Sequence, residues 1–155
     1  MTDAEDLAAR TARRAQIAPG TAAGVDEAMI ARQVHTFYAR VREHPRLGPV
    51  FAAHVEDWDT HLAKLCDFWS SVVLMTGRFK GSPMAAHAGA ADIQSSDFAV
   101  WLELWRQVAR EVCPPAAADL FIAKAEMIGE SLRQGLEMLR AAGSQRARRT
   151  LSFPG

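Results

Sequence analysis

The chain has 155 residues, of which 49% are hydrophobic and 23% are charged, and this composition is typical of one soluble globular domain. Eighteen Lys and Arg residues balance eighteen Asp and Glu residues, which argues against nucleic acid as the main partner because phosphate binding normally needs a basic surplus. The two cysteines, Cys66 and Cys113, form no CxxC pair, which argues against a disulfide scaffold or a zinc finger. No signal peptide and no apolar run of the ~18 residues of a membrane span is visible. We therefore expect a cytoplasmic protein without a membrane partner.

The two ends of the chain differ from its centre. Residues 1–24 are rich in Ala and Arg and end in PGTAAG, so we expect a loosely ordered extension, with at most a frayed helix. Residues 141–155 form a basic tail without periodicity, which we expect to be disordered. The folded domain is predicted to span residues 25–140.

Helical periodicity dominates that domain. A first helix is predicted from the N-cap Asp26 to the HPRLGP segment, where two prolines end it. A second helix is predicted from about Asp57 to Thr76-Gly77. Residues 77–96 are rich in Gly, Ala and Ser and are predicted to form a loop with short helical turns at most.

Two more helices follow this loop. The third is predicted to begin at Ser95 or Ser96, which are suitable N-caps, and to end at Pro114. Pro114 and Pro115 open the last helix, because proline is favoured in a first helical turn. No convincing alternating strand pattern occurs, so the sequence predicts an all-α fold.

Three large side chains with one polar atom each interrupt the apolar stripes of three helices. Tyr38, the only tyrosine, lies on the first stripe, His61 on the second and Trp101 on the third. Taken singly, each is explained as a core residue that bonds a nearby carbonyl. Taken together, they favour a polar pocket between helices.

His87 lies in the segment MAAHAGAA, whose small side chains leave room for a flat cofactor. By itself this residue is better explained as a loop histidine exposed to water. The E-x-x-H pairs of helical di-iron proteins and the HExxH motif are absent. Haem brings four nitrogen ligands of its own and therefore needs only one or two histidines.

Several spaced segments resemble one known family. They are FYARVREHPRLGPVF, WDTHLAKLCDFWSSVVLMTGRFKGSPMAAH, FAVWLELW and AEMIGESL, and together they span roughly residues 26–138. In this order they resemble a truncated haemoglobin of the third group. The resemblance implies a shortened globin fold, a two-over-two helical sandwich around haem b.

The resemblance also implies roles for individual residues. His87 matches the proximal iron ligand, and Tyr38, His61 and Trp101 match the distal pocket that contacts a bound gas. Arg78 matches a position that meets a haem propionate, and Phe79 stands where relatives often have tyrosine. The remaining positions matched to cofactor contacts are Phe51, Leu65, Phe68, Trp69 and again Trp101.

We expect a haem protein that binds oxygen or another diatomic gas reversibly at the iron, for oxygen transport or for nitric oxide or peroxide detoxification. Hydrogen bonds from Tyr38 and Trp101 are expected to slow gas release, whereas the role of His61 as gate, weak donor or sixth iron ligand stays open. A haem-dependent redox enzyme, either a nitric oxide dioxygenase or peroxidase-like, would use nearly the same residues and an external, unidentified reductase. A helical interaction module without cofactor is the third alternative. We expect a monomer, with weak dimerisation left open.

Overall fold

The computed structural model describes residues 2–83 and 92–151. Within these ranges every regular element of four or more residues is a helix, which confirms the expected all-α fold class. None of the helices in the described ranges has both the length and the apolar character that crossing a bilayer requires. In chain order the helices are α1 (Asp3–Ile17), α2 (Pro19–Ala22), α3 (Glu27–Glu43), α4 (Leu47–His54), α5 (Trp58–Leu74), α7 (Ser95–Val112) and α8 (Pro115–Leu151).

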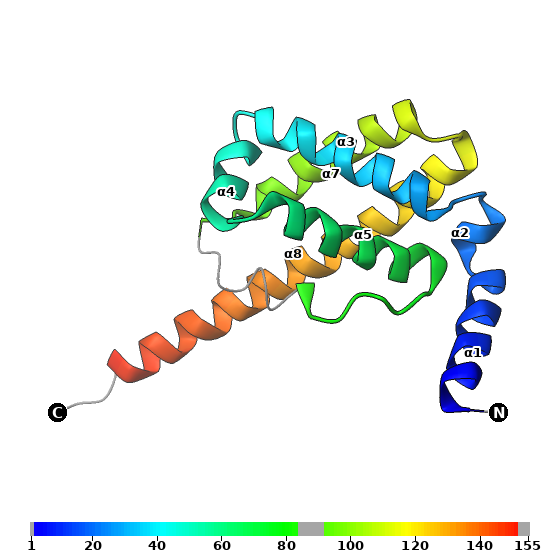
Figure 1. Ribbon diagram of the computed structural model, residues 1–155. Coiled ribbons are helices and arrows are strands. Elements are labelled where there is room, and N and C mark those ends of the chain that lie inside the picture. Colours follow the sequence, from blue (N-terminus) through cyan, green and yellow to red (C-terminus); the bar gives the residue numbers. More distant parts are fainter. Residues whose placement is uncertain (1, 84–91, 152–155) are drawn as a thin grey trace.

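Four long helices form two layers (Figure 1). α3 packs against α5 and α7, α7 packs along α8, and α5 also touches α8. The pair α3 and α5 therefore lies against the pair α7 and α8, which is the two-over-two arrangement that the family resemblance implies. The largest fully buried side chains between these helices include Trp69, Trp105, Phe37, Phe121, Ile30, Val34, Val41, Val73 and Val108.

The N-termini of α3 and α5 are the ones that the sequence predicts. The Asp26 carboxylate accepts the backbone N–H of Met29 at 2.8 Å, and the Asp57 carboxylate accepts two backbone N–H groups in the first turn of α5. Such side-chain caps stabilise a helix by about 0.5–2 kcal/mol. The predicted N-cap Asp26 and the predicted start of the second helix near Asp57 are thus confirmed, and the two caps set where the helices that carry Tyr38 and His61 begin.

The short helix α4 was not predicted, because Gly48 and Pro49 indicate a turn when they are considered alone. Pro49 lies in the first turn of α4, where a missing N–H costs nothing. Gly48 lies so close to the end of α3 that a Cβ atom there would stand 2.7 Å from the carbonyl oxygen of Arg42. Glycine therefore allows α4 to pack against α3, and this contact brings Phe51 towards Tyr38.

The N-terminus of α7 differs from the prediction. The N-cap is Gln94, not Ser95 or Ser96. The Asp97 carboxylate accepts the backbone N–H of Gln94 at 2.8 Å, whereas the Ser95 hydroxyl donates to Glu137 on α8. The observed N-cap lies one residue before the predicted Ser95, because Arg46 positions Asp97 and the Ser95 hydroxyl is bonded to Glu137.

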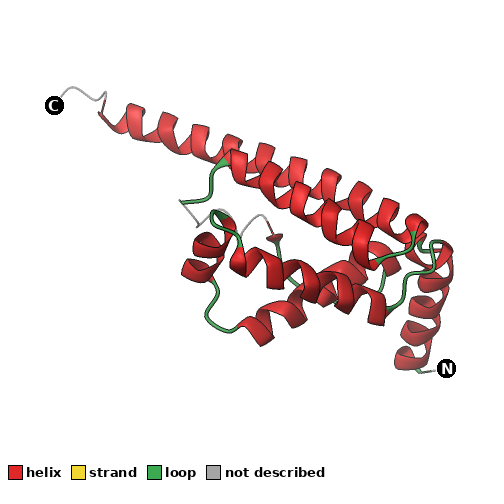
Figure 2. Ribbon diagram, turned by 90° about the horizontal axis from the view of Figure 1, so that it is seen from above, coloured by secondary structure: helices red, strands yellow, loops and turns green. Residues whose placement is uncertain are grey.

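Both ends of the chain are more helical than expected. A capping box in which Thr2 and Glu5 exchange hydrogen bonds starts α1, in the segment predicted to be loosely ordered. α8 continues to Leu151, through most of the segment predicted to be disordered, because Ala, Arg, Gln and Leu all favour helix and the next proline is Pro154. The C-terminal part of α8 projects beyond the other helices (Figures 1 and 2).

Candidate functional site

Tyr38 is the centre of an aromatic cluster between α3, α4 and α5. Its side chain is only 5% exposed. Its ring centroid lies 5.5 Å from that of Phe51 on α4, 5.8 Å from that of His61 on α5 and 6.1 Å from that of Trp58. The packing of three helices therefore converges on one phenol.

His61 lies in the first turn of α5, and its backbone N–H donates to the Asp57 carbonyl at 3.0 Å. The imidazole plane is almost perpendicular to the Tyr38 ring, at 89°, and to the Trp58 ring, also at 89°. The Nε2 atom is buried. An imidazole in this position can donate or accept one proton next to the phenol.

Trp101 reaches the same phenol from α7. A hydrogen bond joins the two side chains, and because an indole only donates, the Tyr38 oxygen accepts it and keeps its own hydrogen for another acceptor. Burial raises the pKa of the Tyr38 phenol far above its ordinary value, and the Trp101 hydrogen bond offsets only part of that rise. Tyr38 is therefore a neutral hydrogen-bond donor at physiological pH.

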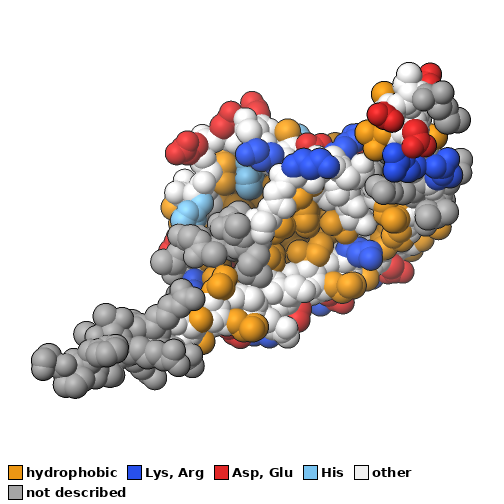
Figure 3. Space-filling model, turned by 90° about the horizontal axis from the view of Figure 1, so that it is seen from below, with side chains coloured by type: hydrophobic (Ala, Val, Ile, Leu, Met, Phe, Trp, Pro, Cys, Tyr) orange, Lys and Arg blue, Asp and Glu red, His pale blue; other side chains and the backbone are white. Residues whose placement is uncertain are grey.

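Apolar side chains on α4, α5 and α7 surround these three groups. Phe51, Leu65, Phe68 and Trp101 all pack on the buried core and are themselves only partly buried. The surface view in Figure 3 shows a recess whose floor is hydrophobic, with histidine and basic side chains at its edge. Partly exposed apolar side chains over a packed core are suited to binding a flat, largely apolar group.

Two residues matched to cofactor contacts lie elsewhere in the fold. Trp69 is 2% exposed and stacks on Trp105 with ring centroids 4.5 Å apart, so it belongs to the core behind the recess. Arg78 forms an ion pair with Glu27 at 3.3 Å.

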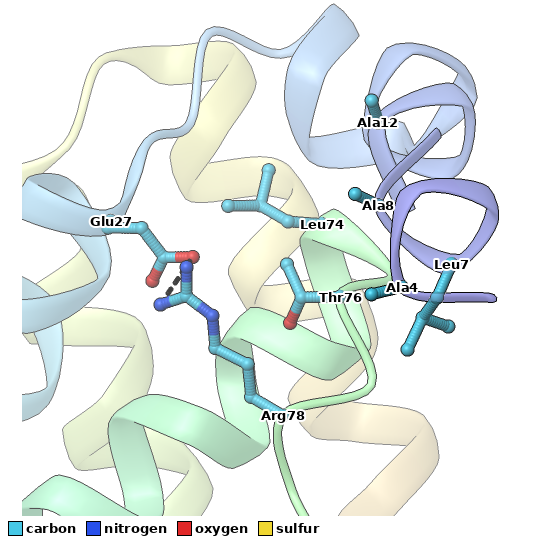
Figure 4. A pocket seen from close by; sticks show the side chains of 8 residues that line it. All are labelled: Ala4, Leu7, Ala8, Ala12, Glu27, Leu74, Thr76 and Arg78. Atoms are coloured by element: carbon cyan, nitrogen blue, oxygen red, sulfur yellow. Dashed lines mark ion pairs between the residues drawn. The ribbon is translucent and has the colours of Figure 1, made fainter. Parts of the chain in front are cut away.

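The Arg78 side chain lines a different cavity, of about 640 Å³, beside α1 (Figure 4). Leu74, Thr76 and alanines of α1 line the same cavity. The structure therefore directs Arg78 towards the N-terminus of α3 rather than towards the Tyr38 cluster.

Two further members of the cluster were not assigned from the sequence. Trp58 stands three residues before His61, on the same helical face, and that spacing could have identified it. The Arg42 guanidinium lies 4.8 Å from the Trp58 ring centroid. The Phe37 ring stands edge-on to the rings of Tyr38 and Trp101, with centroid distances of 4.7 and 5.8 Å. Only the packing of α3 on α7 shows that Phe37 lies between these two residues of the cluster.

His87, the predicted iron ligand, lies outside the described residues. After α5 the described chain continues through residues 75–83, and the description resumes at residue 92, just before α7. Among the described residues, no group of three or more His, Cys, Asp or Glu side chains is arranged to hold a bare metal ion. The described part of the site therefore consists of Tyr38, His61 and Trp101 with their aromatic surroundings.

Comparison with known proteins gives one consistent match. No protein-family model matches the chain. The chain is 27% identical over 116 residues to the group 3 truncated haemoglobin ctb of Campylobacter jejuni, and the alignment covers 72% of this chain and 91% of that protein. It also superposes on the crystal structure of the group III truncated haemoglobin from Campylobacter jejuni with a TM-score of 0.68, over the same shares of the two chains. The helical sandwich and the structural match show an all-α globin fold, and the motifs and both matches make the chain similar to group 3 truncated haemoglobins.

Proposed function

We propose that this protein holds one haem b through His87 and binds a diatomic gas reversibly on the side of the haem that faces Tyr38. The observation that carries the proposal is the convergence of a neutral phenol, a buried imidazole and an indole N–H, from three helices, beside an apolar recess. The globin fold and the similarity to a truncated haemoglobin support the cofactor.

The residues present fit such a group. Porphyrin is flat and largely apolar, and the partly buried side chains of Phe51, Leu65 and Phe68 offer an apolar surface of that kind. When bound, haem supplies an iron atom that binds a gas and shifts negative charge onto it. Hydrogen-bond donors aimed at that charge stabilise the bound gas.

Trp101, Tyr38 and His61 have different roles in this proposal. The Trp101 indole donates to the Tyr38 oxygen, which leaves the phenol hydrogen for another acceptor such as a ligand in the recess. A hydrogen bond to a charged acceptor contributes about 1–3 kcal/mol. His61 closes the α5 side of the cluster and can exchange a proton at Nε2.

The test is reconstitution of the purified chain with haemin, followed by visible spectra of the ferric, ferrous and carbonyl forms. We expect a Soret band that His87→Ala shifts or abolishes, because the substitution removes the proposed iron ligand. His35→Ala is the matched control, since His35 is an exposed histidine on α3, and it should leave the band unchanged. A band that is identical in His87→Ala and in the unmodified chain would refute the assignment of His87.

A haem-dependent redox enzyme is the second candidate, favoured by the buried His61 imidazole 5.8 Å from the phenol ring. In this proposal His61 acts as an acid–base group in nitric oxide or peroxide turnover, and a separate reductase supplies electrons. His61→Leu should then lower turnover while leaving reversible gas binding in place. Turnover with reductant that is no faster than that of free haemin would exclude this candidate.

A further inference from the structure

A set of four polar side chains ties α4 to the segment that leads into α7. We name Arg46, His54, Asp92 and Asp97 the α4 clamp. Arg46 Nε donates to Asp97 Oδ1 and Arg46 Nη2 to Asp97 Oδ2, both at 2.7 Å. The same Nη2 atom donates to the backbone carbonyl of Asp92 at 3.1 Å. One guanidinium at the start of α4 thus holds both ends of residues 92–97.

The other end of α4 holds the same segment. His54, the last residue of α4, places Nε2 at 2.6 Å from Asp92 Oδ1. The His54 hydrogen bond lowers the pKa of the Asp92 carboxyl, and the Arg46 hydrogen bond lowers that of Asp97. Both carboxyls are therefore ionised at neutral pH, and each makes a charge-assisted contact to α4.

The clamp differs from an ordinary surface ion pair. The Asp97 side chain is only 8% exposed, whereas Arg46 is 43% exposed, and Asp97 also caps α7 through the Gln94 N–H. Bidentate guanidinium–carboxylate pairs fix orientation as well as distance. α8 supports the segment from its other side, because Arg140 donates to the Ile93 carbonyl at 2.5 Å.

The two segments that the clamp joins, α4 and residues 92–97, are each connected to the proposed haem site. α4 carries Phe51, whose ring stands 5.5 Å from that of Tyr38. Asp92 follows His87 by five residues, a length of chain that spans at most ~18 Å. Fixing Asp92 therefore limits where the backbone at His87 can lie relative to Phe51 and Tyr38.

We propose that Arg46, His54, Asp92 and Asp97 are positioning residues that hold α4 and residues 92–97 in a fixed relation and thereby slow haem loss. This inference rests on the proposed function, because it needs His87 to bind the iron. None of the four residues is assigned a contact with haem or with the gas.

The experiment measures haem transfer from the reconstituted protein to an excess of a high-affinity apoglobin. Arg46→Ala should raise the rate of haem loss about tenfold, equivalent to about 1.4 kcal/mol. The rate of haem loss from Arg46→Lys should lie between those of the unmodified chain and Arg46→Ala, because an ammonium keeps the charge but cannot form the bidentate pair. The matched control is Arg40→Ala, which removes an arginine of similar exposure whose ion pair to Glu111 joins α3 and α7 at the surface, and it should not change the rate.

A second readout separates positioning from general stability. The iron–histidine stretching band of the ferrous, gas-free protein should shift in Arg46→Ala and not in Arg40→Ala. Equal haem-loss rates and equal bands in these two variants would overturn the clamp while leaving the proposed function intact. Absence of a Soret band in the unmodified chain would overturn both proposals. If circular dichroism shows that Arg46→Ala does not fold, Arg46→Lys and Asp97→Asn decide by the same two readouts.

Discussion

Trp101 and Trp105 stand one turn apart on the same face of α7, yet they have different environments. The Trp105 side chain is fully buried, and its indole N–H donates to the backbone carbonyl of Phe121 at 3.0 Å. Trp101 is partly buried, and its indole N–H donates to the Tyr38 phenol. The two indoles stack at 5.8 Å with an angle of 14°, so the recess and the core are adjacent layers of one aromatic stack.

The difference shows how a helical stripe serves two purposes. A tryptophan whose donor meets a backbone carbonyl contributes mainly buried area and packing. A tryptophan whose donor meets another side chain at the edge of a recess orients that side chain. The three predictions below test this division, from the largest expected effect to the smallest.

Trp105→Ala should lower the free energy of unfolding by about 3–5 kcal/mol, because it opens a cavity between Trp69 and Phe121 in the packed core. Urea unfolding of the chain measures the loss. Trp58→Ala is the matched control, since Trp58 is only partly buried beside Phe51, and its loss should be clearly smaller. Equal losses for the two variants would show that Trp105 in the core and Trp58 beside the recess contribute equally to stability.

Tyr38→Phe should raise the dissociation rate of oxygen about tenfold, if the phenol contributes about 1.4 kcal/mol to the bound state. Stopped-flow replacement of the bound gas measures this rate in the reconstituted protein. Trp105→Phe changes the same aromatic stack without touching the phenol and should leave the rate unchanged. A rate unaffected by the loss of the hydroxyl would remove Tyr38 from the mechanism.

The pKa of Tyr38 gives the smallest and most specific test. Since this is the only tyrosine, ultraviolet titration of the chain reports one phenol. Burial raises its folded-state pKa, so the native chain keeps the proton above pH ~10, where the unfolded chain releases it. Stability should therefore fall as the pH rises above about 10, and tyrosinate should form only on unfolding. An ordinary titration midpoint near pH 10 in the folded protein would contradict the burial of the phenol.

Most of the helical framework follows from the sequence because its signals are local. Asp26 and Asp57 cap helices through N–H groups within three residues, so periodicity and cap chemistry suffice to predict them. The start of α7 could not be placed as well, because the position of Asp97 depends on Arg46, 51 residues away. α4 was missed for a similar reason, since only its packing on α3 shows why Gly48 and Pro49 fit a helix.

The candidate site was predictable in part. Tyr38, His61 and Trp101 stand out because each places a polar atom on an apolar stripe, and the structure brings all three together. The assignments of Trp69 and Arg78 came from family positions alone. In the structure Trp69 stacks within the core and Arg78 pairs with Glu27, while His87 lies outside the described residues.

The amino-acid sequence by itself determined that this chain is helical, where its main helices begin, and which polar side chains interrupt their apolar faces. Those features depend on contacts within one or two helical turns. Only the tertiary structure decided which indole binds a phenol and which a carbonyl, and which acidic partners Arg46 and Arg78 take. Such partners lie tens of residues apart, and the angles at which helices pack determine which of them meet.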